Sequence, residues 1–407
     1  MNRRAVITGI GTVTCVGINR DSFWDAIING RSGIKRISFF EPSQHRTQIA
    51  GEIRDFDPLK YIHSKEVKDM DRISHLSIAA TEEAVDNAGG KLSKDTGIII
   101  GTGIGGITTD DIEHSLYNLK GPRYVHPLAI PMIMCNATAC HISKRYGLMG
   151  PGYTVVTACT SGTNAIGEAY RLIKNGYTNT IIAGGVDASI TPGIFSAWCA
   201  MRVLSTMNDN PEGACKPFSK DRGGMVLSEG AGIVVIEELE QALKRSANIY
   251  AEIIGYGSSY DASHITAPNG NGQAMAMEIA LKEANLPPSE VDYISAHGTG
   301  TVLNDKIETM SIKRVFSNKA YSIPVSSLKS MIGHTLGASG AIGLIASCLS
   351  IRDNIVLPTI NYTTPDPECD LDYVPNKARK SNLNVIMLNS FGFGGSNGVL
   401  IIKRFTL

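Results

Sequence analysis

The chain repeats one order of elements in its two halves. The strand-to-glycine segment TGIIIGTGIGG (96–106) resembles VDYISAHGTGT (291–301), and the closing strand EGAGIVVIEEL (229–239) resembles SNGVLIIKRF (396–405). Strands alternate with helices in each half, which predicts an α/β fold in which helices cover buried sheets. A period this long indicates a duplicated architecture. We therefore expect two similar halves, 1–247 and 248–407, joined at the polar stretch near Arg245.

Composition excludes several classes of protein. The 407 residues exceed the usual size of one hydrophobic core, and 43% hydrophobic with 19% charged residues is typical of a globular protein. Because 38 basic residues balance 38 acidic ones, a nucleic-acid binder is not expected. Eight scattered cysteines without a C-x-x-C motif favour a reducing cytoplasm over a disulfide framework. No apolar stretch approaches the roughly 18 residues that span a bilayer.

One cysteine stands between a predicted strand and a predicted helix. Val155 and Val156 end an apolar run, and the small residues after Cys159 predict a buried helix that opens at the cysteine. The positive end of a helix dipole favours thiolate over thiol. Cys159 is therefore a candidate nucleophile, and a small buried apolar cysteine is the alternative interpretation.

Three more reactive side chains follow predicted strands in the second half. His297 follows the strand in YISAHGTGT, and Lys329 and His334 stand where the repeat has Cys159. Ligands of such sheets gather outside the carboxyl ends of the strands, so we expect these four side chains to share one site. At the start of a helix, His334 would be a neutral N–H donor. Taken singly, each histidine could be structural and the lysine a solvated surface group.

A glycine-rich segment lies near the end of the chain. In NSFGFGGSNG (389–398), Phe391 and Phe393 alternate with glycines, which lets backbone N–H groups approach a ligand as an oxyanion hole requires. The alternative is a tight hairpin turn between two edge strands.

Three other patterns have simpler interpretations. The G-x-G-x-x-G of residues 101–106 is not followed by a strand with an acidic ribose ligand, so we expect no dinucleotide site. The cysteines and histidine of 135–141 match no common zinc spacing, and we expect no metal. Asp305 and Glu308, with Lys306 between them, are interpreted as a structural ion-pair group behind His297.

Together, these motifs resemble the elongating type II branch of the β-ketoacyl-acyl-carrier-protein synthases, condensing enzymes of the thiolase superfamily. The resemblance runs nearly end to end, through AVITGIG (5–11), TACTSG (157–162), AGGVDAS (183–189), HGTGT (297–301), LKSMIGHTLGASGA (328–341) and NSFGFGGSNG. It implies a five-layered αβαβα fold built from two βαβαβαββ halves, and a homodimer.

The resemblance also implies decarboxylative carbon–carbon bond formation without a cofactor, since the acyl carrier protein bears the phosphopantetheine. Cys159 would take the acyl chain from its thioester, and the N–H groups of Cys159 and Phe393 would hold the oxyanion. His297 and His334 would stabilise the enolate of a malonyl thioester. Lys329 would hold charge close to His334.

Binding residues are implied in the same way. Thr299 and Thr301 would bind pantetheine, and Trp198 and Phe393 would line the acyl pocket, with Phe393 as its gate. Trp198 is bulkier than the aromatic usual there, and Gly343 replaces a glutamate common in fatty-acid enzymes. A specialised lipid or polyketide pathway is therefore a hypothesis beside fatty-acid synthesis.

Docking of an acidic carrier protein is implied at three cations, Lys65, Lys68 and Arg202, although Asp69 stands where a further basic residue is usual. Two other functions compete with condensation. One is a catalytically silent, chain-length-setting partner subunit, which has no need for the cysteine and the two histidines together. The other is an unrelated nucleophilic-cysteine hydrolase, which has no need for a second histidine donor.

Overall fold

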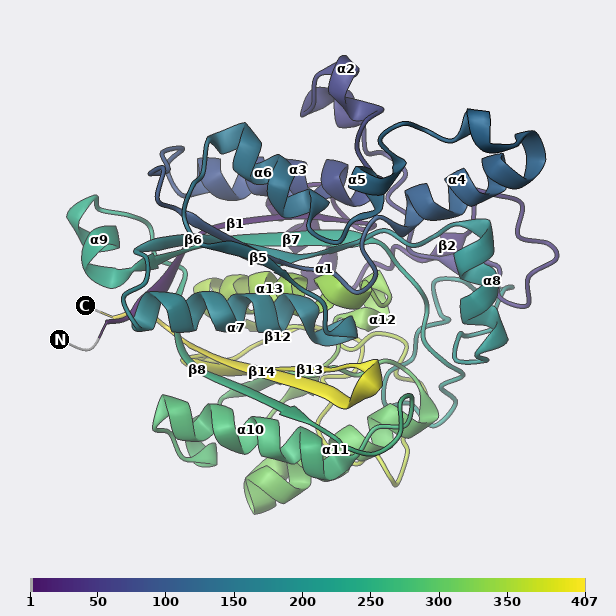
Figure 1. Ribbon diagram of the computed structural model, residues 1–407. Helices are drawn as coiled ribbons and strands as arrows, with labels where there is room; N and C mark the ends of the chain where they lie inside the picture. Colours follow the sequence, from purple (N-terminus) through teal and green to yellow (C-terminus); the bar gives the residue numbers. More distant parts are fainter. Residues whose placement is uncertain (1–2, 407) are drawn as a thin grey trace.

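The computed structural model describes residues 3–406 and contains the same arrangement of strands twice (Figure 1). The strand orders are β5-β4-β6-β7-β1 and β10-β9-β13-β14-β8, so each half arranges its third, second, fourth, fifth and first strands in that order. The predicted duplication is confirmed. The strands are β1 (Ala5–Thr14), β4 (Gly97–Gly101), β5 (Gly152–Val155), β6 (Thr180–Asp187) and β7 (Gly230–Glu238), then β8 (Ala251–Tyr260), β9 (Tyr293–Ser295), β10 (Val325–Ser326), β13 (Val385–Phe391) and β14 (Ser396–Lys403).

Helices form three layers around the two sets of strands, which confirms the predicted five-layered fold (Figure 1). The outer layer of the first half contains α3 (Arg72–Asn87) and α6 (Ala137–Tyr146). The outer layer of the second half contains α10 (Gly270–Ala284) and α11 (Val302–Phe316). The middle layer contains α7 (Ser161–Lys174) and α13 (Ser339–Asp353), one from each half.

Shorter elements surround these layers. The remaining helices are α1 (Arg20–Ile28), α2 (Ser64–Val67), α4 (Ile107–Lys120), α5 (Ala129–Ile133), α8 (Pro192–Ala200), α9 (Leu239–Lys244) and α12 (Lys329–Ile332). Two short strand pairs are β2 (Lys35–Arg36) with β3 (Ile49–Ala50), and β11 (Ile355–Val356) with β12 (Arg379–Lys380). Single 3-10 turns are η1 (Pro58–Lys60), η2 (Pro122–Tyr124), η3 (Ala158–Thr160), η4 (Pro288–Glu290), η5 (Ser317–Tyr321), η6 (Leu336–Ala338) and η7 (Phe393–Gly395). No helix within residues 3–406 has both the length and the apolar character needed to cross a membrane.

The small residues of the middle layer let its two helices approach closely. A Cβ at Gly162 of α7 would lie 2.6 Å from the Gly337 carbonyl oxygen, and one at Gly340 of α13 would lie 1.9 Å from Thr163 Oγ1. Side chains at these positions are therefore excluded by the contact itself. The close approach brings the N-terminal ends of α7 and α13 together.

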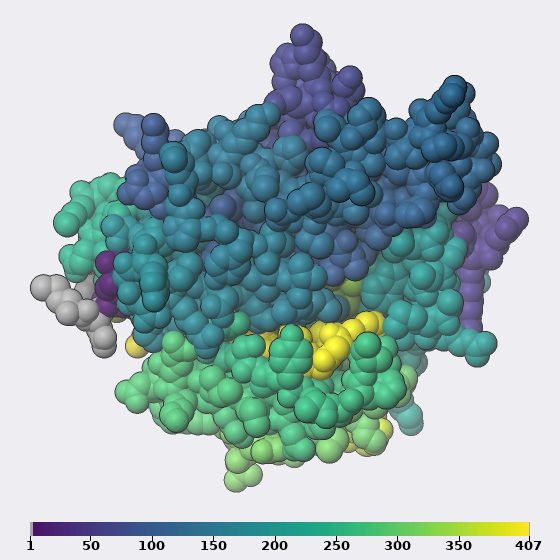
Figure 2. Space-filling view, viewed as in Figure 1, coloured from purple at the N-terminus to yellow at the C-terminus, as the bar shows by residue number. Residues whose placement is uncertain are grey.

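The two halves share a sheet edge and a core. β1 pairs with β8 over only three residue pairs, from Ala5↔Ile253 to Ile7↔Ala251, and the two sets of strands then diverge into separate layers (Figure 1). The predicted boundary between residues 247 and 248 falls in the connection from α9 to β8. Figure 2 shows the C-terminal residues, in yellow, at the surface between the two halves.

The structure corrects the register of the repeat around the cysteine. In the first half η3 leads directly into α7, and in the second half η6 leads directly into α13. Both turns begin at a residue in the left-handed region, Ala158 with φ 52° and Leu336 with φ 47°. The counterpart of Cys159 is therefore Gly337, and not Lys329 or His334 as predicted. The difference arises because the second half inserts the short helix α12 between its strand and its turn.

Candidate active site

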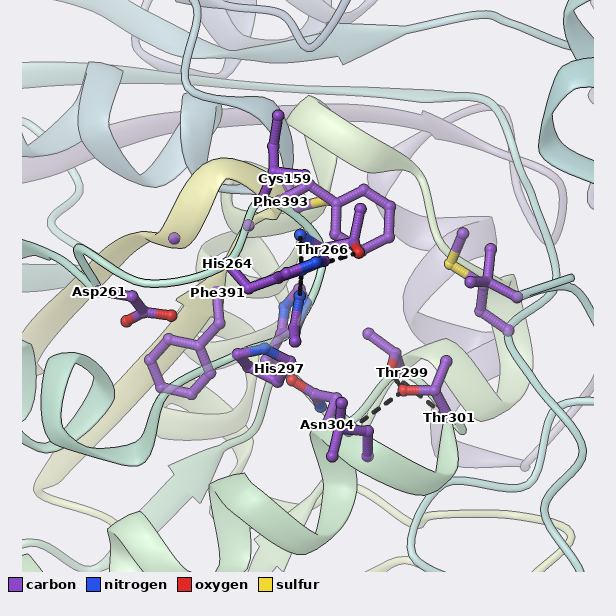
Figure 3. A pocket seen from close by; sticks show the side chains of 18 of the residues that line it. Cys159, Asp261, His264, Thr266, His297, Thr299, Thr301, Asn304, Phe391 and Phe393 are labelled. Atoms are coloured by element: carbon purple, nitrogen blue, oxygen red, sulfur yellow. Dashed lines mark hydrogen bonds between the residues drawn. The ribbon is translucent and has the colours of Figure 1, made fainter. Parts of the chain in front are cut away.

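The four predicted reactive side chains converge where the middle-layer helices begin. His334 Nε2 lies 3.1 Å from Cys159 Sγ. The rings of His297 and His334 lie nearly perpendicular, with centroids 5.3 Å apart. Lys329 Nζ lies 2.5 Å from the backbone carbonyl oxygen of His297. All four side chains are buried, and Figure 3 shows Cys159 and His297 facing one cavity.

Cys159 sits in a protein interior that opposes its ionisation. Burial raises the pKa of the Cys159 thiol to about 11, while the charge of Lys329 and the backbone N–H groups of Phe393 and Cys159 favour the thiolate. The thiol is therefore less acidic than its place at the start of a helix alone predicts, because burial raises its pKa. The two interpretations of Cys159, a buried cysteine and a potential nucleophile, therefore do not exclude each other.

Hydrogen bonds fix which nitrogen of His334 bears the proton. The Leu336 backbone N–H donates to Nδ1 at 3.2 Å, and Ser339 Oγ lies 3.0 Å from the same nitrogen. A neutral imidazole whose Nδ1 accepts has its proton on Nε2. Burial and then the charge of Lys329 hold the pKa of His334 well below its ordinary value. His334 thus points a neutral Nε2–H at Cys159 Sγ.

The sequence predicted the neutral state of His334 for the wrong reason. We expected a helix to open at His334, but α13 begins five residues later, at Ser339. The residue instead forms a single bridge with Leu227, through bonds from its N–H to the Val226 carbonyl oxygen and from Ser228 N–H to its own carbonyl oxygen. Burial, and not a helix terminus, keeps its imidazole neutral.

A carboxylate and a lysine orient His297. Its backbone N–H donates to Glu308 Oε1 at 2.8 Å, and Gly298 N–H donates to Oε2 at 2.7 Å. Lys329 Nζ lies 3.5 Å from His297 Nδ1, so a protonated lysine directs the imidazole proton to Nε2. Burial, then Lys329 and His334, lower the pKa of His297 well below its ordinary value. Lys329 therefore contacts His297, whereas we expected it beside His334.

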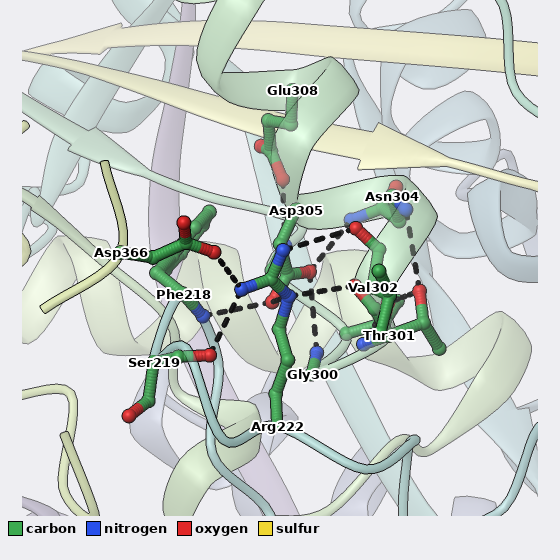
Figure 4. A network of polar contacts seen from close by, with 12 residues as sticks. Phe218, Ser219, Arg222, Gly300, Thr301, Val302, Asn304, Asp305, Glu308 and Asp366 are labelled. Atoms are coloured by element: carbon green, nitrogen blue, oxygen red, sulfur yellow. Dashed lines mark hydrogen bonds and ion pairs between the residues drawn. The ribbon is translucent and has the colours of Figure 1, made fainter. Parts of the chain in front are cut away.

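The acidic residues behind His297 do not form the predicted group with Lys306. Asp305 lies 3.8 Å from Arg222, which pairs with Asp366 at 2.5 Å (Figure 4). Lys306 instead pairs with Glu368. Arg222 also donates to the backbone carbonyl oxygens of residues 301 and 302, at the start of α11. Asp305 accepts from the backbone N–H groups of residues 218 and 300. This buried network fixes the wall of the cavity from behind.

The glycine-rich segment is both a hairpin turn and part of the site. η7 connects β13 to β14, and Gly394 adopts φ 80°, which its lack of a side chain permits. The two strands are interior strands, not the edge strands of the alternative interpretation, because β9 and β8 flank them. The backbone N–H groups of Phe393 and of Cys159 itself both favour the thiolate form of Cys159, so both lie beside the sulfur. An oxyanion hole needs such a pair of backbone donors next to the nucleophile.

A cavity of about 160 Å³ opens above Cys159 (Figure 3). Thr299, Thr301, Trp198 and Phe393 all line it, as do both histidines. The hydroxyl oxygens of Thr299 and Thr301 lie 2.8 Å apart, and the rings of Trp198 and Phe393 stack with centroids 6.1 Å apart. One wall is thus polar and the other aromatic.

One wall of this cavity was not predicted from any motif in the sequence. Residues 261–269 follow β8 and place His264 and Thr266 at the cavity (Figure 3). The Gly394 N–H donates to the Ile265 carbonyl oxygen at 2.6 Å, which ties this loop to the glycine-rich turn. The loop has no periodic pattern and no nucleophile. Its only signal was its place after a strand end.

The three predicted docking cations are exposed but stand on different elements. Lys65 and Lys68 belong to α2 and its end, which project from the outer layer (Figure 1). Arg202 follows α8 and precedes Val203, which lines the cavity. Asp69 lies 3.6 Å from His126. Within residues 3–406, no cluster of three or more His, Cys, Asp or Glu side chains is suited to hold a metal ion.

Comparison with known proteins identifies the family. The model of the β-ketoacyl synthase N-terminal domain matches residues 2–242, and that of the C-terminal domain matches residues 250–363. The chain belongs to the β-ketoacyl synthase family. It is 44% identical over 409 residues to the 3-oxoacyl-[acyl-carrier-protein] synthase 2 of Synechocystis sp., covering 99% of this chain and 98% of that one.

Solved structures of family members share this fold. The ishigamide ketosynthase/chain length factor superposes with a TM-score of 0.94 at 35% identity and full coverage of both chains. A type II polyketide ketosynthase in complex with its acyl-carrier protein, bound to the hexaketide, gives a TM-score of 0.93 at 33% identity, also with full coverage. The resemblance seen in the sequence is confirmed over the whole length of this β-ketoacyl synthase.

Proposed function

We propose that this chain condenses an acyl group, held on Cys159, with malonyl-acyl-carrier protein to give a β-ketoacyl-acyl-carrier protein. The observation that supports this most is the 3.1 Å contact between Cys159 Sγ and His334 Nε2, with the His297 ring beside it in the same cavity. The relative from Synechocystis bears the name of this activity over its whole length.

In the first step the Cys159 sulfur attacks the carbonyl carbon of an acyl thioester. The negative charge on the carbonyl oxygen is stabilised by the N–H groups of Cys159 and Phe393. The bond to the pantetheine sulfur breaks, and the carrier leaves as a free thiol with the proton that Cys159 loses. Cys159 now forms a thioester with the acyl chain.

In the second step a malonyl thioester enters past Thr299 and Thr301. The bond to its carboxylate breaks and carbon dioxide leaves, so that the electron pair forms an enolate. The neutral Nε2–H groups of His297 and His334 stabilise the enolate oxygen. The enolate carbon attacks the acyl-Cys159 carbonyl, the carbon–sulfur bond breaks, and a chain two carbons longer leaves on the carrier protein.

The proposal extends to the cofactor requirement, compartment, oligomeric state and carrier docking of the enzyme. The reaction uses no cofactor of its own, because the carrier protein brings the phosphopantetheine. We assign the enzyme to the cytoplasm, where the free cysteines stay reduced. A homodimer is favoured by the edge strand β5, where Tyr153 is 41% exposed and Val156, directly after the strand, is 50% exposed. Lys65, Lys68 and Arg202 would meet the acidic carrier.

One experiment separates this proposal from its two competitors. The protein is incubated with acyl- and malonyl-carrier protein, and the carrier species are resolved by mass spectrometry. A β-ketoacyl carrier that disappears in Cys159→Ala supports condensation. No acyl adduct would support the silent partner subunit, and release of free acid would support a hydrolase.

A further inference from the structure

We propose that Asp187 is a positioning residue for His334, which it holds through the backbone amide of Gly337. The inference concerns the active site of the proposed function and rests on it for its kinetic consequence. Asp187 ends β6, lies beside the turn η6, and is completely buried. It belongs to the first half of the chain, whereas His334 and Gly337 belong to the second.

Backbone and hydroxyl donors surround the Asp187 carboxylate. Oδ2 accepts from Gly337 N–H at 2.6 Å and from Gly103 N–H at 2.8 Å, and Oδ1 accepts from Thr102 Oγ1 at 2.8 Å. Burial raises the pKa of Asp187 to about 6, and these donors oppose that rise. A buried carboxylate that relies on neutral donors is costly for the fold. Such a group persists where its position serves another purpose.

The bond to Gly337 acts on His334 through the two residues between them, Thr335 and Leu336. Leu336 adopts φ 47°, a conformation unfavourable for leucine, and its N–H is the donor to His334 Nδ1. The backbone of His334 is held on the other side by Val226 and Ser228. With both ends fixed, Leu336 must present its N–H to the imidazole. That bond, together with the contact of Ser339 Oγ with the same nitrogen, keeps the His334 proton on Nε2, facing Cys159.

The internal repeat relates this contact to the turn that bears Cys159 in the first half. Gly337 is the counterpart of Cys159, so Asp187 binds in one half the amide that corresponds to the proposed oxyanion donor in the other. A Cβ at Gly337 would lie 2.7 Å from Asp187 Oδ2, which leaves room for the carboxylate only if the residue is glycine. The turn of the first half thus bears the nucleophile Cys159, and the equivalent turn of the second half binds the Asp187 carboxylate.

Asp187→Ala tests the proposal, because it removes the carboxylate that accepts the bonds from the amides of Gly103 and Gly337, whereas an Asn side chain could turn its amide oxygen toward them. We expect kcat for condensation to fall roughly tenfold to a hundredfold while KM stays within about twofold. We also expect ¹⁵N NMR of histidine-labelled protein to show that His334 loses its single Nε2–H tautomer. Asp292→Ala is the matched control, since Asp292 also accepts from two backbone N–H groups, those of Asn384 and Val385, away from the cavity.

A second variant keeps the test decisive if Asp187→Ala fails to fold. In Gly103→Ala the new Cβ would lie 2.9 Å from Asp187 Oδ2 and displace the carboxylate without removing it. The same tautomer change and a smaller loss of kcat are expected. A folded variant with the His334 tautomer and kcat of wild type would overturn the proposal. If wild type makes no β-ketoacyl product, the proposed function fails, and the NMR result still decides the role of Asp187.

Discussion

At the scale of single residues, the site keeps the cysteine and both imidazoles neutral beside the charge of Lys329. Burial raises the pKa of Cys159 and lowers those of His297, His334 and Lys329. Neutral imidazoles can donate from Nε2 to an enolate oxygen without first losing or gaining a proton. The sequence predicted these four residues, but it could not predict that Lys329 contacts His297, because that pairing depends on the turn geometry.

The reactivity of Cys159 should follow its high pKa. With a pKa of about 11, the thiolate fraction rises about tenfold per pH unit at neutral and mildly alkaline pH. Alkylation of the Cys159 peptide by iodoacetamide, followed by mass spectrometry, should rise accordingly. Lys329→Met should move the rise to higher pH, because the charge of Lys329 favours the thiolate; Lys306→Met is the control. A rate that levels off near neutral pH would contradict this account.

Removal of either imidazole should impair decarboxylation. His297→Ala and His334→Ala each delete one N–H donor to the enolate oxygen, which costs roughly 10² to 10³ in kcat for comparable donors. Release of carbon dioxide from malonyl-carrier protein measures the loss. Nearly unchanged decarboxylation in both variants would show that the enolate is stabilised elsewhere.

At the scale of elements, the sequence predicted what local patterns determine and missed what distant contacts determine. The alternation of strands and helices predicted sheets covered by helices, and the small residues after Cys159 predicted that α7 is buried. The register of the second turn was wrong because α12 interrupts the repeat, and the wall formed by residues 261–269 depends on a bond to Gly394 far along the chain.

Helix α8 should influence which acyl chains bind. It places Trp198 against Phe393 at the apolar wall of the cavity. Trp198→Ala removes this bulk, so we expect the distribution of β-ketoacyl products to move toward longer chains, measured by mass spectrometry with a panel of acyl-carrier substrates. An unchanged distribution, with Phe393 still in place, would mean that other residues set the chain length.

At the scale of the whole molecule, catalysis requires both halves. Cys159 comes from the first half, and His297, Lys329 and His334 come from the second, and all four meet because the ends of α7 and α13 are adjacent. A carrier protein must therefore bring its substrate to a cavity that residues of both halves line.

Charge reversal should reveal where the carrier approaches. Lys65→Glu, Lys68→Glu and Arg202→Glu should each raise KM for acyl-carrier protein at low salt, and the effect should shrink as salt screens it. A short acyl thioester without carrier should react as with wild type. Lys91→Glu, an exposed charge outside the proposed docking set, is the control. Equal effects on both substrates would rule out a docking role.

The central claim is that one reaction uses the sulfur of the first half and the imidazoles of the second. A single-turnover experiment tests it most directly: acyl-Cys159 enzyme is isolated, mixed with malonyl-carrier protein, and followed by mass spectrometry of both proteins. The account predicts that wild type loses its acyl group as β-ketoacyl carrier forms, whereas His334→Ala keeps the acyl group on Cys159. Product formation by His334→Ala at the wild-type rate would contradict it.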